Sequence, residues 1–267
     1  MIRPAAVAGQ FYPADPLQLR SAVHNLLPQP SEKSRALAFM VPHAGYIYSG
    51  GVAGSVYSSL QLPAKFLLLG PRHFPHGERF AILSEGAWET PLGRAAIDEA
   101  LALEIKNAFP LLREDAIAHA REHSLEVQLP FLQCLVPNFT FVPIVLGADR
   151  FDALQSLGRA IAQVLSKHTE QIALLVSSDM NHYESDAVTR LKDRKAIDAI
   201  LSLDARRLYD TVRRESISMC GYAAAVAMLA SAHELHAKEA KLISYATSAE
   251  ASGDFDRVVG YAGIVVR

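Results

Sequence analysis

The chain has 267 residues, of which 50% are hydrophobic and 20% are charged, so it can bury a sizeable core within a single α/β domain. Its 26 Lys and Arg residues nearly balance its 28 Asp and Glu residues, which gives a formal net charge of −2 at pH 7. Because no basic stripe or basic tail is present, the chain does not resemble a nucleic-acid-binding protein, and we expect no nucleic-acid partner.

The cysteine count and the N-terminal segment are typical of a reducing compartment. Only Cys134 and Cys220 are present, far apart in sequence, which excludes the disulfide framework of a small secreted domain. The segment 1–13 has one Arg and no apolar run that ends in small residues, unlike a secretory signal. No run of about eighteen apolar residues suggests a membrane span. We therefore expect a cytoplasmic protein without membrane attachment.

Short apolar runs alternate with amphipathic segments along almost the whole chain, which predicts interleaved strands and helices. In chain order we expect helix Leu17–Leu27, strand Leu37–Val41, helix Gly51–Leu60, strands Phe66–Leu69 and Phe80–Leu83, helices Asp98–Asn107 and Leu125–Leu135, strand Phe139–Leu146, helix Asp152–Ser166, strand Ile172–Ser177, helices Ala187–Leu201, Ala205–Arg213 and Gly221–His233, and strands Lys241–Ala246 and Val258–Val265. Continuous apolar strands are typical of sheets covered on both faces. The pattern predicts one α/β domain over residues 1–267, with a mixed, mostly parallel sheet and helices on both faces.

Three histidines follow predicted strands at equivalent places. His43 comes two residues after the strand that ends at Val41, and His73 and His182 each follow another strand within a few residues. Ligands of open α/β sheets bind at the carboxyl ends of the strands. If these strands are neighbours and parallel, the three imidazoles converge on one crevice.

Further candidates for the same crevice come from two loops. Cys220 stands just before a predicted helix, where unpaired N–H groups favour the thiolate, which is both the nucleophilic and the metal-binding form of cysteine. The segment Glu122–Glu126 is expected to open a helix, with its two glutamates one turn apart on one face. His123, between them, is either a pocket residue or a helix cap. Gly54 and its neighbouring glycines match no nucleotide-binding spacing and indicate a tight turn and close helix packing.

Several ordered motifs together resemble the Memo family (mediator of ErbB2-driven cell motility), whose prokaryotic members are called AmmeMemoRadiSam system protein B. The resemblance covers nearly the whole chain. The motifs that carry it are Ala8–Pro13, Pro42–Tyr46, Leu69–Pro71, Glu122–Glu126, Ser177–Asp179 with His182, and Cys220–Gly221.

The resemblance implies a fold similar to the class III extradiol dioxygenases, which bind non-haem Fe(II) through two histidines and a glutamate. It assigns His43, His73 and Cys220 to one metal ion. It assigns the acid/base position to His182, with Asp179 nearby. His123 is implied as a further pocket residue.

A thiolate in place of the carboxylate departs from the facial triad of non-haem iron oxygenases, so Fe(II) or copper is expected, with zinc as an alternative. Arg72 is a second departure, because a small polar residue is expected there. It is expected to narrow the pocket or to contact an anion.

Three functions are compatible with these residues. The first is a metal-dependent, dioxygenase-like oxidoreductase in which His182, oriented by Asp179, moves protons. The second is a metal-free hydrolase or transferase with Cys220 as nucleophile and His182 as base.

The third is a non-catalytic adaptor for phosphotyrosine peptides, which the resemblance to animal members implies, with contacts from Arg72, Tyr46 and Tyr48. The substrate is thus a small molecule or a peptide. The family name also implies radical-SAM and AMMECR-type protein partners.

Overall fold

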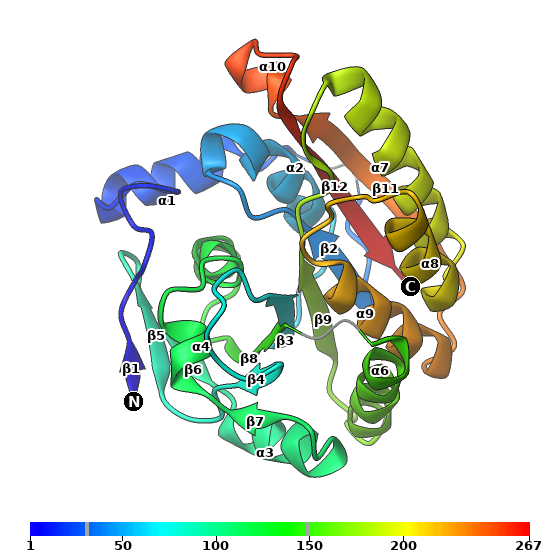
Figure 1. Cartoon of the computed structure of the whole chain (residues 1–267). Helices are drawn as coiled ribbons and strands as arrows, with labels where there is room; N and C mark the ends of the chain where they lie inside the picture. The colour runs from blue at the N-terminus through cyan, green and yellow to red at the C-terminus, as the bar shows by residue number, and fades with distance from the viewer. Residues whose placement is uncertain (30–31, 148–149) are drawn as a thin grey trace.

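The apolar runs of the sequence form the centre of one sheet in the computed structural model, which describes residues 1–29, 32–147 and 150–267 (Figure 1). The twelve strands of this sheet are β1 (Ile2–Arg3), β2 (Ala38–Val41), β3 (Lys65–Pro71), β4 (Phe80–Ile82), β5 (Ala87–Thr90), β6 (Gly93–Ile97), β7 (Arg113–Glu114), β8 (Thr140–Leu146), β9 (Ile172–Ser177), β10 (His182–Glu184), β11 (Ala240–Thr247) and β12 (Val258–Val266). The seven predicted strands are all present. The mixed α/β prediction is therefore confirmed.

The four central strands are parallel and lie in the order β8, β3, β9, β2. In the register of this core, Leu67 of β3 pairs with Leu174 of β9, and Val41 of β2 pairs with Ser177 of β9. Antiparallel strands flank the core: β12 pairs with β2, and β4 pairs with β8. Because the central strands are parallel, their carboxyl ends lie at one edge of the sheet.

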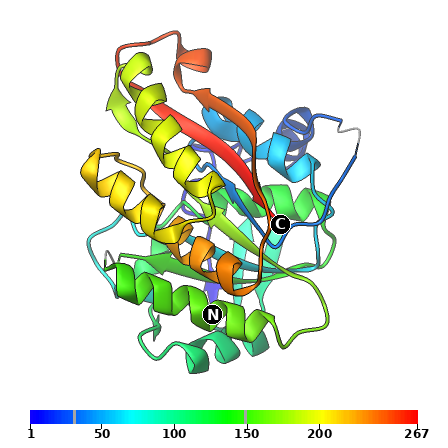
Figure 2. The ribbon, with the colours of Figure 1, turned by 90° about the vertical axis from the view of Figure 1, so that its right-hand side faces the viewer.

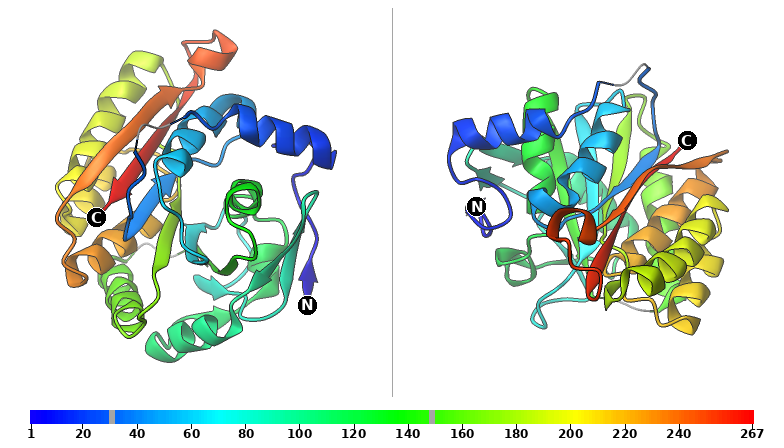
Figure 3. Two further views of the ribbon diagram at one scale, coloured as in Figure 1. Left: turned by 180° about the vertical axis from the view of Figure 1, so that it is seen from behind. Right: turned by 90° about the horizontal axis from the view of Figure 1, so that it is seen from above.

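Helices cover both faces of the sheet (Figures 2 and 3). They are α1 (Pro16–Asn25), α2 (Tyr46–Ser58), α3 (Glu99–Ala108), α4 (Ala116–Ala120), α5 (Leu129–Leu135), α6 (Phe151–Leu165), α7 (Asp186–Leu201), α8 (Ala205–Arg214), α9 (Tyr222–Glu234) and α10 (Ala249–Ser252). The helices α3, α6, α7, α8 and α9 pack on one face, and α1, α2 and α5 pack on the other. None of the helices within the described ranges is both long and apolar enough to cross a membrane.

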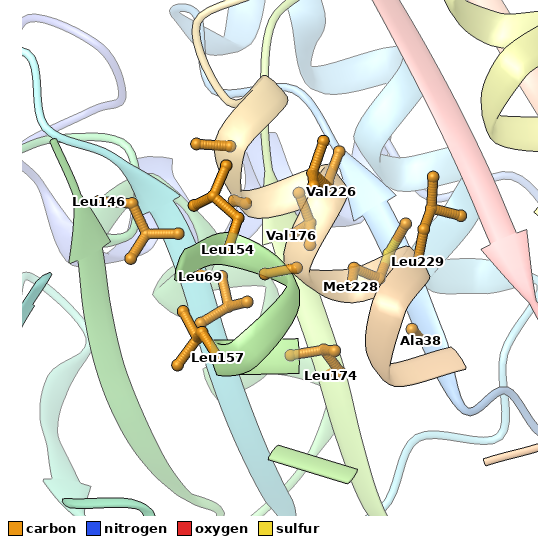
Figure 4. Close-up of a cluster of buried hydrophobic side chains, with 14 of the residues drawn as sticks. Ala38, Leu69, Leu146, Leu154, Leu157, Leu174, Val176, Val226, Met228 and Leu229 are labelled. Atoms are coloured by element: carbon orange, nitrogen blue, oxygen red, sulfur yellow. The ribbon is translucent and has the colours of Figure 1, made fainter. Parts of the chain in front are cut away.

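Alternate side chains of the central strands enter different cores, as the two-residue period of a strand requires. Leu69 belongs to the core under α6 and α9, whereas its neighbour Leu68 belongs to the core under α1, α2 and α5. Figure 4 shows the first core, where Leu69 and Val176 of the sheet meet Leu154 of α6. Both faces of the central strands are dry, which explains why their sequences are continuously apolar.

Two predicted helices begin several residues away from the expected position, whereas the other six begin within one residue of it. The helix predicted from Gly51 begins at Tyr46, because Gly45 is its N-cap and glycines in its first turns masked the helical pattern. The segment predicted as one helix from Leu125 forms a 3-10 turn over Glu126–Gln128 before α5 begins. Pro130 stands at the start of α5, where its missing N–H costs no hydrogen bond.

Gly54 is required by the contact of α2 with the end of α1, and this contact gives a test of the fold. A Cβ at Gly54 would overlap the backbone carbonyl of Leu26, whereas a Cβ at Gly51, in the same helix, would meet open space. We expect Gly54→Ala to lower the free energy of unfolding by about 1–3 kcal/mol through overpacking. Gly51→Ala should raise it by about 0.5–1 kcal/mol, because alanine favours the helix. Urea denaturation of both variants measures the difference, and equal effects would contradict the packing described.

Candidate functional site

The predicted crevice is present where the central strands end. His43 follows β2, His73 follows β3, and His182 follows β9 as the first residue of β10. These residues share one cavity of about 690 Å³. The six predicted site residues that line it are His43, His73, His123, Asp179, His182 and Cys220. The parallel order of β3, β9 and β2 thus brings together residues that are far apart in sequence, as expected from the strand pattern.

Three imidazoles form the inner end of this cavity. Among the residues that the structure describes, the one group of possible metal donors is His43, His73 and His123, with one nitrogen of each within 4.8 Å of the others. The ring centroids of His43 and His73 are 5.2 Å apart, and the ring of His123 stacks on that of His73 at 4.6 Å. Burial lowers the pKa of His123 to about 4, so its ring is neutral at pH 7 and keeps a lone pair for a metal.

The tautomer of His43 follows from the hydrogen bonds of Ser177, the last residue of β9. The hydroxyl of Ser177 donates its only proton to the carbonyl of Ser124, at 2.6 Å. It therefore accepts the proton of His43 Nδ1, which lies 2.9 Å away. Since Nδ1 carries the proton, His43 Nε2 is unprotonated, and its lone pair lies 3.2 Å from the sulfur of Cys220. Burial and the neighbouring histidines also lower the pKa of His43, which keeps the ring neutral.

Glu122 orients His73 in the same way. His73 Nδ1 donates to Glu122 Oε1 at 2.9 Å, and the backbone N–H of His73 donates to Oε2 at 2.7 Å. Burial alone would raise the pKa of Glu122, but these bonds and the N–H of Ser124 lower it to about 2, so the carboxylate stays ionised. A histidine whose second nitrogen is bound to a carboxylate is the usual arrangement of a metal ligand.

His182 is oriented by Ser218 and not by Asp179, which corrects the partner expected from the sequence. The carbonyl of Ser218 accepts the proton of His182 Nδ1 at 2.8 Å, and the hydroxyl of Ser218 accepts the backbone N–H of His182 at 2.7 Å. A carbonyl can only accept, so His182 Nε2 is unprotonated in the neutral ring. Burial lowers the pKa of His182, so the ring is unprotonated at neutral pH and its Nε2 is available to accept a proton.

Asp179 instead supports the metal side of the cavity. Its Oδ1 accepts the backbone N–H of His43 at 2.7 Å, and its Oδ2 lies 4.0 Å from His43 Nε2. Its own backbone N–H donates to the sulfur of Cys220 at 3.2 Å. Burial raises the pKa of Asp179 to about 6, although the N–H of His43 opposes this shift. Asp179 thus links the loops that carry His43 and Cys220.

Cys220 lies beside His43, with 3.2 Å between its sulfur and Nε2. It precedes Gly221, the N-cap of α9, as expected, but the structure contradicts the predicted thiolate character. Burial and the nearby Asp179 raise the pKa of Cys220 well above its usual value, because both disfavour a negative sulfur. The few N–H groups that point at the sulfur do not outweigh these effects.

The two glutamates expected on one helix face serve different purposes, because Glu122 precedes the 3-10 turn. Glu126 is fully buried and pairs with Arg3 at 2.6 Å, and it also accepts the hydroxyl of Tyr12. The guanidinium of Arg3 donates to the carbonyls of His119 and Glu122. The N-terminal segment therefore fixes the loop that carries His123.

Arg72 does not enter the cavity, contrary to expectation. Its guanidinium donates to the carbonyls of Gly77 and Glu78 in its own loop and packs against Gly147. Tyr46 is also absent from the cavity lining, because its hydroxyl donates to the carbonyl of Val127. Tyr48 does line the cavity.

No sequence pattern predicted the outer wall of the cavity. Tyr183, Asp254, Arg257 and Tyr261 belong to this wall. The last three come from the segment before and within β12, an antiparallel strand. The rule that ligands bind at the carboxyl ends of parallel strands therefore does not apply to this segment.

Comparison with known proteins assigns the chain to a family. A model of the Memo-like protein family matches residues 3–265. The chain belongs to the Memo-like family. It is 39% identical to a MEMO1 family protein of Methanopyrus kandleri, over 100% of this chain and 99% of that protein. Memo-like relatives of Sulfolobus acidocaldarius, at 40% identity over 99% of both chains, and of Aquifex aeolicus, at 39% identity over 99% and 98%, are similar. The family predicted from the motifs is thus confirmed.

A solved structure has a similar fold. The crystal structure of an uncharacterized Escherichia coli K12 protein, JW3007, aligns with a TM-score of 0.55 over 86% of this chain and 100% of that one. The two sequences are 12% identical, so the likeness concerns the fold alone.

Buried His119, next to Arg3, predicts a loss of stability in acid. Burial lowers the pKa of His119 to about 4, from an ordinary value of 6.5. The unfolded chain therefore binds a proton before the folded protein does, and stability that is complete above pH 6.5 decreases as the pH falls towards 4. In metal-free protein, the free energy of unfolding of His119→Leu should therefore fall by up to about 3 kcal/mol less than that of the wild type over this pH range.

The control is His233→Leu, because the ring of His233 is 81% exposed and stays in solvent when the protein unfolds. Urea denaturation at pH 7, 5.5 and 4 measures both variants. Equal loss of stability in acid for His119→Leu and the wild type would show that His119 is not its cause.

Proposed function

We propose that this Memo-like protein is a metal-dependent oxidoreductase, similar to the non-haem dioxygenases, with its metal at the inner end of the cavity. The observation that carries the proposal is the orientation of two imidazoles from neighbouring strands. His43 and His73 each direct Nδ1 at an oxygen acceptor, which leaves both Nε2 atoms for one ion.

The residues present fit a metal ion. The sulfur of Cys220 is 3.2 Å from His43 Nε2. Two donors that share an ion at bond lengths of 2.0–2.3 Å and a tetrahedral angle lie about 3.6 Å apart, so this separation needs only a small adjustment. We therefore keep Cys220 as the proposed third ligand. His123 competes for that position, since its nitrogen belongs to the same group as those of His43 and His73.

A bound Fe(II) or copper ion would supply electron transfer to dioxygen, and zinc would supply Lewis-acid chemistry instead. The roles of the side chains follow from their hydrogen bonds. His182 accepts or returns a substrate proton at Nε2, because Ser218 holds the proton on Nδ1. Asp179 positions His43 and Cys220 through the backbone N–H contacts described above.

The raised pKa of Cys220 disfavours the metal-free hydrolase. A nucleophilic cysteine needs a lowered pKa or a base that can take its proton. This thiol is buried beside Asp179, and the base next to it, His43 Nε2 at 3.2 Å, belongs to a ring whose own pKa is lowered by burial. The phosphopeptide adaptor remains the second candidate, because exposed aromatic side chains, Tyr48 and Tyr183 among them, surround the open end of the cavity. Radical-SAM and AMMECR-type partners and a cytoplasmic location stay predictions.

Metal content tests the proposed site. Protein purified without chelator should hold about one ion per chain, and His43→Ala or His73→Ala should remove it. Cys220→Ser should weaken metal binding more than His123→Gln, because sulfur is the stronger donor for a soft metal. Elemental analysis measures the content, and anaerobic Fe(II) loading followed by oxygen uptake with phenolic substrates tests turnover. A chain that binds no metal under any condition would overturn the proposal.

Alkylation of Cys220 separates the metal site from the metal-free nucleophile. In a Cys134→Ala background, iodoacetamide should label Cys220 slowly at pH 7 even with chelator, because the thiol is protonated. Bound metal should slow labelling further. Mass spectrometry follows the reaction. Rapid labelling that is indifferent to chelator would favour the hydrolase instead.

A further inference from the structure

The cavity continues outward from the histidines to a wall that the proposed metal chemistry does not use. Most of this wall comes from α10, β12 and the segment between them, and both α10 and β12 contact α2 (Figure 3). At about 690 Å³ the whole cavity has the size of a small-molecule site. It is therefore large enough to hold a small substrate that contacts both the histidines and this wall.

Aromatic rings line the cavity along its length. Phe11, Tyr48, Tyr183 and Tyr261 come from four separate segments of the chain. Tyr183 is notable because its φ is +62°, a left-handed conformation that is strained for a large side chain, and because it is 66% exposed. Strained residues persist where the surrounding structure requires them, and they cluster at binding sites.

Among the described residues that line this cavity, Arg257 is the one side chain with a permanent positive charge. Its guanidinium lies 5.7 Å above the ring of Tyr183, next to the open end. Across residues 1–29, 32–147 and 150–267, no carboxylate forms an ion pair with Arg257 and no acceptor forms a hydrogen bond with it. The guanidinium keeps its donors for a ligand, and its planar shape suits a carboxylate.

The other charges of the cavity limit the charge of the ligand. Asp254 lines the same outer wall, and its Oδ1 accepts the backbone N–H of Asp256. Arg257 and Asp254 therefore nearly cancel at the open end. A singly charged carboxylate is neutralised by pairing with Arg257. A doubly charged phosphate would keep one uncompensated charge after this pairing, and Asp254 would repel it about twice as strongly. The balance of charges favours a monocarboxylate.

We infer that the outer half of the cavity binds the carboxylate of a small aromatic acid through Arg257, with the aromatic ring of the acid between the tyrosines. The inference rests on the proposed function, because it names the substrate class of the same site. The carboxylate of the ligand is thereby held at the open end, and the opposite edge of the ligand's ring faces the histidines, His182 included.

The test compares 4-hydroxybenzoate with the neutral 4-hydroxybenzamide and with phenyl phosphate, by NMR titration of the metal-free and the metal-loaded protein. The wild type should bind the acid about tenfold or more tightly than the amide, because a charged hydrogen bond is lost in the amide. Arg257→Gln should abolish this preference, and Arg257→Lys should keep part of it. The matched control is Arg213→Gln, since Arg213 also lies over a tyrosine ring, that of Tyr209, but outside the cavity.

Equal binding of acid and amide, or an unchanged preference in Arg257→Gln, would overturn the inference. Tighter binding of phenyl phosphate than of the acid would overturn it too, in favour of a phosphate ligand. The metal-free arm separates this result from the proposed function. Acid binding that depends on Arg257 in a protein that takes up no metal would support the binding site and refute the oxidoreductase. Metal uptake without acid selectivity would refute the inference alone.

Discussion

The hydroxyl of Ser177 is the contact on which the site depends. Ser177 is the last residue of the central strand β9. Its hydroxyl accepts hydrogen bonds from His43 and from the amide of Gln128, and donates one to the carbonyl of Ser124. Gln128 in turn donates to the carbonyl of Pro42. One side chain therefore joins the end of β2, the end of β9 and the loop of His123. Because a hydroxyl has a single proton, these hydrogen bonds also determine which nitrogen of His43 is unprotonated.

Much of the fold could be predicted from the sequence, because parallel strands buried on both faces leave continuous apolar runs. Ile172–Ser177 is such a run, and the structure has the same bounds for β9. The strands β5 and β6 were not predicted, since the half-buried Glu89 and the exposed Arg94 interrupt their apolar pattern. Their pairing depends on distant partners that no local pattern shows.

The site was predictable to the extent that it follows the ends of parallel strands. His43, His73 and His182 were expected to converge for this reason, and they line one cavity. Their hydrogen-bond partners were not predictable, because Ser218 lies in a loop 36 residues from His182. The same holds for Arg257, which follows no parallel strand.

The strand β12 has a consequence for the order of events during synthesis. It is synthesised after the other strands of the sheet, yet it pairs with β2, one of the first of them, and it carries Tyr261 of the cavity wall. The edge of β2 thus lacks this neighbour until residues 258–266 have been synthesised, although every proposed metal ligand is already present by Cys220. A nascent chain can in this way bring the metal ligands together before the cavity around them is complete. Until then the unpaired edge of β2 is the apolar surface that a chaperone would need to shield.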